Sequence, residues 1–286
     1  FEMLRHHEHP NIVKAVDFFI VRGRAVLVLE YFDGVTLDRL LKSKSSHALS
    51  EGTVRRLTRA LLETVEHLHQ RRVLHRDIKP GNVLVSKDAR DIRLIDFNTA
   101  CCLSAGDSLT PTGTRLYAAP EVVLGESPSE GADVWAVGAC AYLMLSGHLP
   151  QGRQRCANSQ SELQKAVCHP AKFSSACWEH VSESCKAMLQ RCLALDLRDR
   201  PSPKDLLAMS WFHEAPHAGG GAAFSEHSIL KDAFQRCPLL PGLEPAAPPP
   251  SSSPLAACHS SLSVSTGLPS SSCSTVATPK RLGRRP

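Results

Sequence analysis

A short charged loop between a helical stretch and an apolar strand constrains this chain more than any other feature. The loop reads His75-Arg76-Asp77-Ile78-Lys79-Pro80-Gly81-Asn82, and a second acid, Asp96, follows Asn82 by 14 residues. An acid can hold a hydroxyl, a lysine can neutralise a moving phosphoryl group, and amide and carboxylate oxygens can bind a metal ion. The spacing of these groups predicts a phosphoryl-transfer site.

Composition sets the class of protein around this loop. The chain has 286 residues, 42% of them apolar, and a net charge of +5, which does not by itself indicate a nucleic-acid partner. Its 11 cysteines include no CxxC pair, which favours a reduced, cytoplasmic chain over a disulfide framework. A zinc site is the weaker alternative, because its candidate ligands lack the usual paired spacing. Those candidates are Cys156, Cys168, His169, Cys177 and His180.

No segment predicts insertion into a membrane. The longest apolar run, Val134–Leu145, has 12 residues, whereas a bilayer-spanning helix needs roughly 20. A basic cluster at 280–285 leaves open a nuclear location, or a nucleic-acid or nuclear-targeted binding module as a competing hypothesis. Such a short cluster is more typical of a solvated chain end.

Apolar periodicity and capping residues predict a mixed α+β chain. We expect helices over 1–7, 36–42, 50–70, 132–146, 160–168, 178–194 and 203–210. We expect a hairpin within 13–29 with its turn at 21–24, a connector over 30–35, and strands at 83–85 and 92–95. The polar stretch 96–120 predicts a long functional loop. From 215 onward the Pro- and Ser-rich composition predicts a disordered tail with one weakly helical island, 224–237.

The ordered set of motifs resembles the eukaryotic protein kinase superfamily of the serine/threonine type. The matching segments are His9–Val13, Leu27–Tyr31, His75–Asn82, Asp96–Asn98, Gly113–Glu121, Asp133–Gly138 and Asp199–Ser202. A chance match to one such motif is common, but matches to all of them in the family's order are not. The segment ending at Phe212 is weakly similar to calcium/calmodulin-type members.

The resemblance implies a kinase-like α+β fold, mainly the helical large lobe plus the last strands of the small lobe. Residues 1–29 match the C-terminal part of the small lobe, 30–214 match the hinge and large lobe, and 215–286 form the tail. The family's Gly-rich loop and strand lysine have no counterpart before His9. We therefore expect the chain to be a fragment, or an incomplete gene product, that neither binds ATP tightly nor phosphorylates on its own.

The resemblance assigns catalytic roles residue by residue. Asp77 would orient the substrate hydroxyl, Lys79 would face the γ-phosphoryl group of ATP, and Thr114 would support both. Asn82 and Asp96 would hold Mg²⁺ between the phosphates. The position of Lys79 is typical of kinases that act on serine and threonine in proteins.

The resemblance also assigns an adenine site. Glu30 and Phe32 would offer backbone groups at the hinge, Leu84 would lie under the adenine ring, and Leu29 would be the gatekeeper. Without the resemblance, these residues read as an ordinary strand end and core leucines.

Other matching residues are structural. Glu121 and Arg200 would form a buried ion pair, and Asp133 would accept backbone N–H groups of the catalytic loop. The residues His75, Phe97 and Leu4 match the family's hydrophobic spine.

A regulatory reading follows from Arg76, which in this family is linked to loop phosphorylation by an upstream kinase. Thr110 is the favoured site, and Ser108 and Thr112 are its alternatives. The plainer reading is a flexible Ser/Thr-rich loop.

Two further departures from the family pattern affect the reading. Asn98 replaces a glycine, which predicts a loop of reduced freedom that keeps its metal ligand. Gly81 and Thr36 stand where members that prefer basic substrates carry acids, so such a preference is not expected. The leading hypothesis is a protein kinase, and the alternative is a pseudokinase or scaffold with little turnover.

Overall fold

The computed structural model describes residues 2–43, 48–103, 114–152 and 159–214. The chain divides into two units, Phe1–Leu239 and Leu240–Pro286, and every described residue belongs to the first. The predicted tail, with its helical island at 224–237, lies outside the described residues, as does the middle of the predicted 96–120 loop.

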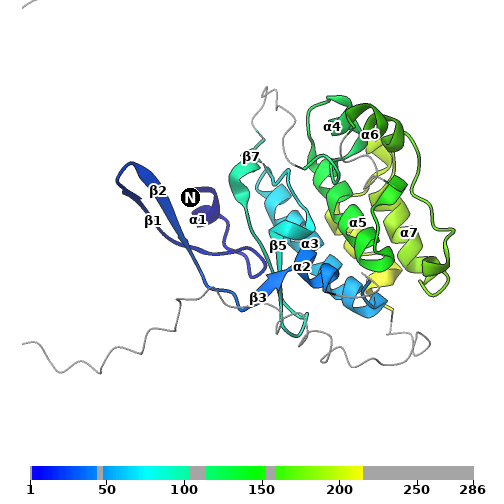
Figure 1. The fold of residues 1–286 in the computed structure, drawn as a ribbon, viewed down its shortest axis with the longest axis horizontal. Coiled ribbons are helices and arrows are strands. Elements are labelled where there is room, and N and C mark those ends of the chain that lie inside the picture. Colours follow the sequence, from blue (N-terminus) through cyan, green and yellow to red (C-terminus); the bar gives the residue numbers. More distant parts are fainter. Residues whose placement is uncertain (1, 44–47, 104–113, 153–158, 215–286) are drawn as a thin grey trace, which may run out of the picture. The chain divides into compact units, whose positions relative to one another are not determined.

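Within the described residues, the strands all lie before residue 103, among the helices α1, α2 and α3, and helices dominate the rest (Figure 1). The helices are α1 Glu2–His6, α2 Leu37–Lys42, α3 Glu51–Gln70, α4 Pro120–Leu124, α5 Glu130–Ser146, α6 Gln160–Val167, α7 Glu183–Cys192 and α8 Pro203–Leu207. The strands are β1 Ala15–Val21, β2 Arg24–Leu29, β3 Gly34–Thr36, β4 Val73–Leu74, β5 Val83–Ser86, β6 Ile92–Leu94 and β7 Cys101–Cys102. Short 3₁₀ turns are η1 Pro80–Asn82, η2 Phe97–Thr99, η4 Ala176–Trp178, η5 Leu197–Asp199 and η6 Ser210–Phe212.

The strands β1 and β2 form the predicted hairpin. They pair antiparallel, with Phe18 opposite Leu27, and turn at Arg22 and Gly23, both at positive φ. The segment before the hairpin is hydrogen-bonded to the strand β6, since Val13 donates its N–H to the Leu94 carbonyl at 3.1 Å. Several apolar side chains of the hairpin are exposed: Val16, Phe18, Phe19, Ile20, Val21, Leu27 and Leu29.

A three-stranded antiparallel sheet has the order β3-β5-β6. The strands β5 and β6 follow the charged loop 75–82 in the sequence, and β3 precedes it. Side chains alternate along β5, so Val83 and Val85 are buried while Leu84 is half-buried on the opposite face. The prediction of a plain connector over 30–35 was wrong at its end, because Gly34–Thr36 becomes a strand by pairing with β5.

The helical core is built around α3 and α5, which lie side by side in Figure 1 and pack against each other. Ser50 caps α3 by accepting the N–H of Thr53, and the helix agrees with the one predicted over 50–70. The helix α5 is buried along almost its whole length, as its continuous apolar sequence indicated. Close packing of α5 on α7 needs a glycine, because a Cβ added at Gly138 would lie 2.5 Å from the Cβ of Cys192.

Several predicted boundaries were wrong for local reasons. The helix predicted over 178–194 begins at Glu183, because Ser182 caps it and Trp178 closes a separate 3₁₀ turn. The helix predicted over 203–210 ends at Leu207. The predicted loop 96–120 contains the short strand β7, which pairs with β4, and α4 begins at its end.

The fold class is confirmed as α+β with a large helical part. Within the described parts of the chain, no helix is long and apolar enough to cross a membrane.

Candidate active site

One buried carboxylate, that of Asp133, accepts hydrogen bonds from the backbone of the charged loop. Asp133, in the first turn of α5, accepts the N–H of His75 at 3.0 Å and that of Arg76 at 2.9 Å. Arg76 has a φ of 66°, a left-handed conformation that costs an L residue about 1–2 kcal/mol. The two hydrogen bonds hold the loop in this conformation, and His69 Nε2 donates a third hydrogen bond to Asp133 Oδ2 at 3.1 Å.

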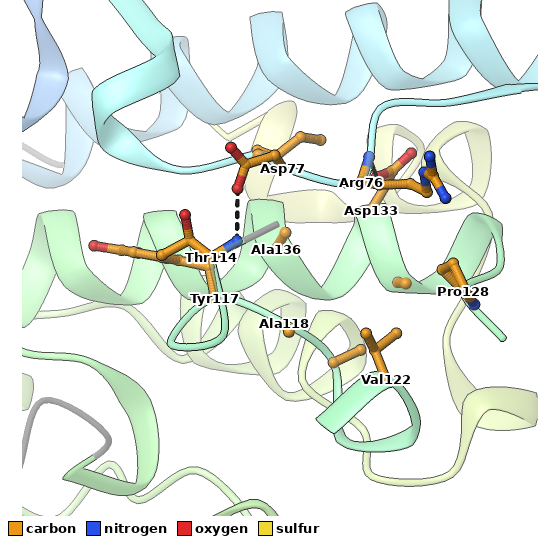
Figure 2. A pocket seen from close by; sticks show the side chains of 12 residues that line it. Arg76, Asp77, Thr114, Tyr117, Ala118, Val122, Pro128, Asp133 and Ala136 are labelled. Atoms are coloured by element: carbon orange, nitrogen blue, oxygen red, sulfur yellow. Dashed lines mark hydrogen bonds between the residues drawn. The ribbon is translucent and has the colours of Figure 1, made fainter. Parts of the chain in front are cut away.

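Asp77 lies at the centre of the site and is fixed from several directions. Its Oδ1 accepts the backbone N–H of Thr114 at 2.8 Å, which Figure 2 shows as a dashed line. Its Oδ2 accepts Lys79 Nζ at 2.6 Å and Asn82 Nδ2 at 3.0 Å. Lys79 Nζ also donates to Thr114 Oγ1 at 2.8 Å. The carboxylate is only 8% exposed, so its position is set by the protein rather than by solvent.

Asn82 and Asp96 lie where they can offer oxygen atoms. The side-chain NH₂ of Asn82 donates to Asp77, which leaves its amide oxygen as an acceptor. The Asn82 carbonyl accepts the N–H of Ile95 at 2.9 Å, so the residue before Asp96 is hydrogen-bonded to Asn82. Asp96 is exposed and takes a left-handed conformation with φ 63°. An amide oxygen and a carboxylate suit Mg²⁺, which prefers oxygen ligands.

The electrostatics keep Asp77 ionised and His75 neutral. Burial alone would raise the pKa of Asp77, but hydrogen bonds from Lys79 and Thr114 hold that pKa below its ordinary value. Burial lowers the pKa of His75. Its Nδ1 accepts the N–H of Asp77 at 3.3 Å, so the proton lies on Nε2, which faces the Ile95 carbonyl at 3.2 Å.

The rings of His75 and Phe97 meet edge to face at 4.8 Å, so two of the predicted spine residues are in contact. Leu4, the third, is buried in the same hydrophobic core.

The predicted hinge residues follow β2. The N–H of Glu30 donates to the Lys14 carbonyl at 2.9 Å, and the Phe32 carbonyl accepts from Gly34 at 2.9 Å. Among the described residues, the Glu30 carbonyl and the Phe32 N–H have no hydrogen-bond partner. One acceptor and one donor two residues apart match the edge of an adenine ring.

The side chains at the hinge have partners that the sequence did not indicate. The Glu30 carboxylate accepts Arg93 Nε at 3.0 Å, and the Arg93 guanidinium lies 4.9 Å from the ring centre of Phe32. Leu84 lies opposite Arg93 in the sheet and is half-buried, and Leu29 is 39% exposed.

Glu121 and Arg200 form a two-pronged ion pair in the core. Each guanidinium Nη donates to one carboxylate oxygen at 2.6 Å, and the side chains are 8% and 0% exposed. Arg200 also donates to the carbonyls of Gly131 and Ala194. The pair links the start of α4 to the segment before α8.

Two residues of the site were missed in the sequence. His69, at the end of α3, contacts Asp133. The backbone carbonyl of Thr99 accepts a hydrogen bond from Arg76 Nε at 2.5 Å, and the Thr99 hydroxyl donates to the His75 carbonyl at 3.0 Å. These contacts join positions 23 to 64 residues apart. No local pattern signals them.

A narrow cavity of about 20 Å³ lies beside this site (Figure 2). Its walls include Asp77, Thr114, Tyr117, Val122 and Ala136. The volume has room for about one water molecule.

Two sequence predictions cannot be placed fully. Ser108, Thr110 and Thr112 lie outside the described residues, as does Cys156. Within the described ranges, no group of three or more His, Cys, Asp and Glu side chains could hold a metal ion.

Comparison with known proteins shows which family the chain is similar to. The family model described as "Protein kinase domain" matches residues 1–212. The chain is 30% identical over 238 residues to calcium/calmodulin-dependent protein kinase type 1 of Macrobrachium nipponense, covering 82% of this chain and 66% of that protein. It is 30% identical over 264 residues to ribosomal protein S6 kinase alpha-6 of Danio rerio, covering 86% and 35%. It is 31% identical over 215 residues to ribosomal protein S6 kinase alpha-1 of Homo sapiens, covering 73% and 29%. The chain therefore spans 29% to 66% of the length of these relatives.

Proposed function

The chain belongs to the protein kinase domain family, and we propose that it carries the catalytic loop of an enzyme that transfers the γ-phosphoryl group of ATP to serine or threonine hydroxyls of proteins. The observation that carries this proposal is the cluster of Asp77, Lys79, Asn82 and Thr114, joined by hydrogen bonds of 2.6–3.0 Å. The names of the relatives, which are kinases, support it.

In this proposal each member of the cluster acts on one part of the reaction. Asp77, ionised and fixed, accepts the hydrogen bond of the acceptor hydroxyl and orients its oxygen toward the phosphoryl group. Lys79, already within 2.6 Å of Asp77, places its positive charge beside the group being transferred. Thr114 fixes the positions of both side chains, because its N–H donates to Asp77 and its hydroxyl accepts from Lys79.

The nucleotide side uses oxygen ligands and the hinge. Asn82 and Asp96 would hold Mg²⁺, which when bound offsets the negative charge of the phosphates. The Glu30 carbonyl and the Phe32 N–H would bind the adenine edge, with Leu84 below the ring and Leu29 beside it. Arg93 supports this site by holding the Glu30 carboxylate.

Regulation by an upstream kinase is part of the proposal. A phosphate on Thr110, or on Ser108 or Thr112, would be recognised by Arg76. The guanidinium of Arg76 is already positioned by the Thr99 carbonyl.

Nucleotide affinity is proposed to be weak in the chain as given. The residues before His9 contain no Gly-rich phosphate loop and no strand lysine. Isothermal titration with Mg-ATP on these 286 residues tests this, and tight binding would contradict it.

Turnover is tested on the protein at its natural length. Phosphoryl transfer from labelled ATP to serine and threonine peptides should occur and should fall by about 10²-fold or more in Asp77→Asn, because that variant loses the charge that orients the hydroxyl. A natural-length protein that folds and binds Mg-ATP but transfers no phosphate to any peptide would favour the alternative, a scaffold with the kinase fold.

A further inference from the structure

Next to the proposed catalytic cluster lies an arginine that the proposed function does not use. We propose that Arg115 recognises a negatively charged group, a carboxylate or a phosphate, close to the acceptor hydroxyl in the substrate protein. This inference rests on the proposed function, since it concerns the acceptor side of the same site.

The first argument is position. Arg115 directly follows Thr114, whose N–H lies 2.8 Å from Asp77 Oδ1. A hydroxyl held by Asp77 therefore brings the neighbouring residues of its peptide within reach of the segment that begins at Thr114. The side chain of Arg115 is exposed, so a bound peptide can contact it.

The second argument is that the segment is rigidly supported. Leu116 and Ala118, which follow Arg115, pack against a small separate core formed by Val123, Leu163 and Val167. Thr114 is held by Asp77 and Lys79 on the other side. Arg115 therefore stands on a backbone fixed at both ends, which lowers the entropy cost of binding a charged ligand.

The third argument is that the guanidinium is positioned without being neutralised. Arg115 Nη1 donates to Gln160 Oε1 at 2.9 Å, and Gln160 Nε2 donates to the Val123 carbonyl at 3.3 Å. The second bond fixes which end of the amide faces Arg115. Within the described part of the chain, no carboxylate lies within ion-pair distance of Arg115. A guanidinium has five N–H donors, and a fork of two suits a carboxylate or a phosphate.

The fourth argument is that the other charged side chains of the site have other roles in the proposed function. Lys79 faces the transferred phosphoryl group, Arg76 faces a phosphate on the preceding loop, and the buried Asp133 is only 2% exposed. The cavity beside Asp77, at about 20 Å³, is too small to select a large side chain by its size. Charge recognition by Arg115 is then one selective contact that this face offers.

The test measures peptide binding, which does not require turnover. Three peptides share one sequence with a single acceptor serine and differ only at the positions that flank it. These positions carry aspartate in the first peptide, phosphoserine in the second and lysine in the third. Fluorescence anisotropy gives the affinity of each peptide for the 286-residue chain. We expect the aspartate and phosphoserine peptides to bind about five-fold tighter than the lysine peptide, the size of one exposed charge contact. A preference for only one of the two anionic peptides identifies whether carboxylate or phosphate is the natural ligand.

Variants assign the preference to this residue. Arg115→Glu should reverse the order of the peptides, Arg115→Lys should keep it with a smaller ratio, and Gln160→Ala should weaken it. Arg191→Glu is the matched control, an exposed arginine on α7 outside the site, and should leave the order unchanged.

Two outcomes would overturn the inference: an order that Arg115→Glu does not alter, or no binding of any peptide at millimolar concentration. Failure of the proposed function would appear differently, as Arg115-dependent binding without phosphate transfer by the natural-length protein.

Discussion

The buried ion pair of Glu121 and Arg200 allows a sharp test of what holds this fold together. Arg200→Met keeps most of the side-chain volume but removes the charge, so the Glu121 carboxylate remains in the core without its partner. Both side chains are nearly inaccessible, at 8% and 0% exposed, and both hydrogen bonds measure 2.6 Å. Breaking a buried pair of this kind costs about 3–5 kcal/mol.

The chain offers a control of the same geometry in a different environment. Arg198 Nη2 lies 2.6 Å from Asp196 Oδ2, the same separation as in the buried pair, but its side chain is 88% exposed. Arg198→Met should therefore change the unfolding free energy far less, because water replaces the lost partner.

Urea unfolding followed by circular dichroism at pH 7 measures both variants, and an unchanged m value confirms that only stability has changed. The double variant Glu121→Leu/Arg200→Met should lose less than the sum of the single losses, since neither charge is then left alone. It should not recover fully, because the carbonyls of Gly131 and Ala194 lose their donor. Equal losses in the Arg200 and Arg198 variants, or simple additivity in the double variant, would refute the reasoning.

Three further predictions concern the loop and its surroundings. Asp133→Asn should lower the unfolding free energy by about 1–3 kcal/mol and speed amide exchange in the catalytic loop, and unchanged exchange would contradict the role assigned to Asp133. Burial and the neighbouring Arg71 lower the pKa of His67 to about 4. Between pH 6.5 and 4 the unfolded chain therefore binds a proton that the folded chain does not, and the unfolding free energy should fall as the pH falls through this window. His67→Gln should flatten the measured dependence of the unfolding free energy on pH. Asn98→Gly should lower thermal stability slightly, because glycine loses more backbone entropy than asparagine, and a large gain in stability would show that Asn98 is strained.

The long helices were predictable because burial imposes a period on the sequence. In α3 the apolar positions recur every three or four residues, and Ser50 supplies a capping oxygen immediately before them. Both signals are local. The predicted helix over 50–70 therefore agrees closely with the observed Glu51–Gln70.

The elements that could not be predicted depend on distant partners. The strands β4 and β7 have two residues each and exist because Val73 pairs with Cys102 and Leu74 pairs with Cys101. Two residues are too short to show a period, so nothing in the local sequence distinguishes them from loop.

In the candidate site too, some residues have a local sequence signal and others depend on distant partners. Asp77, Lys79 and Asn82 are close in sequence, so their motif indicated them together, and the structure places them within hydrogen-bond distance. The contact of Arg115 with Gln160 spans 45 residues and joins two surfaces that only the folded chain brings together.

Asn98 illustrates how a departure from a family pattern is read differently once the backbone is known. The sequence predicted a loop of reduced freedom, since a glycine commonly supplies a positive φ at that point. In the structure the positive φ falls on Asp96, and Asn98 lies in the following 3₁₀ turn, where an asparagine meets no steric penalty. The Asp96 carboxylate accepts the N–H of Asn98 at 3.5 Å, a long contact that favours this turn only weakly. The side chain at 98 therefore costs nothing in the observed conformation, and it would matter only in a second conformation that required a positive φ at this residue.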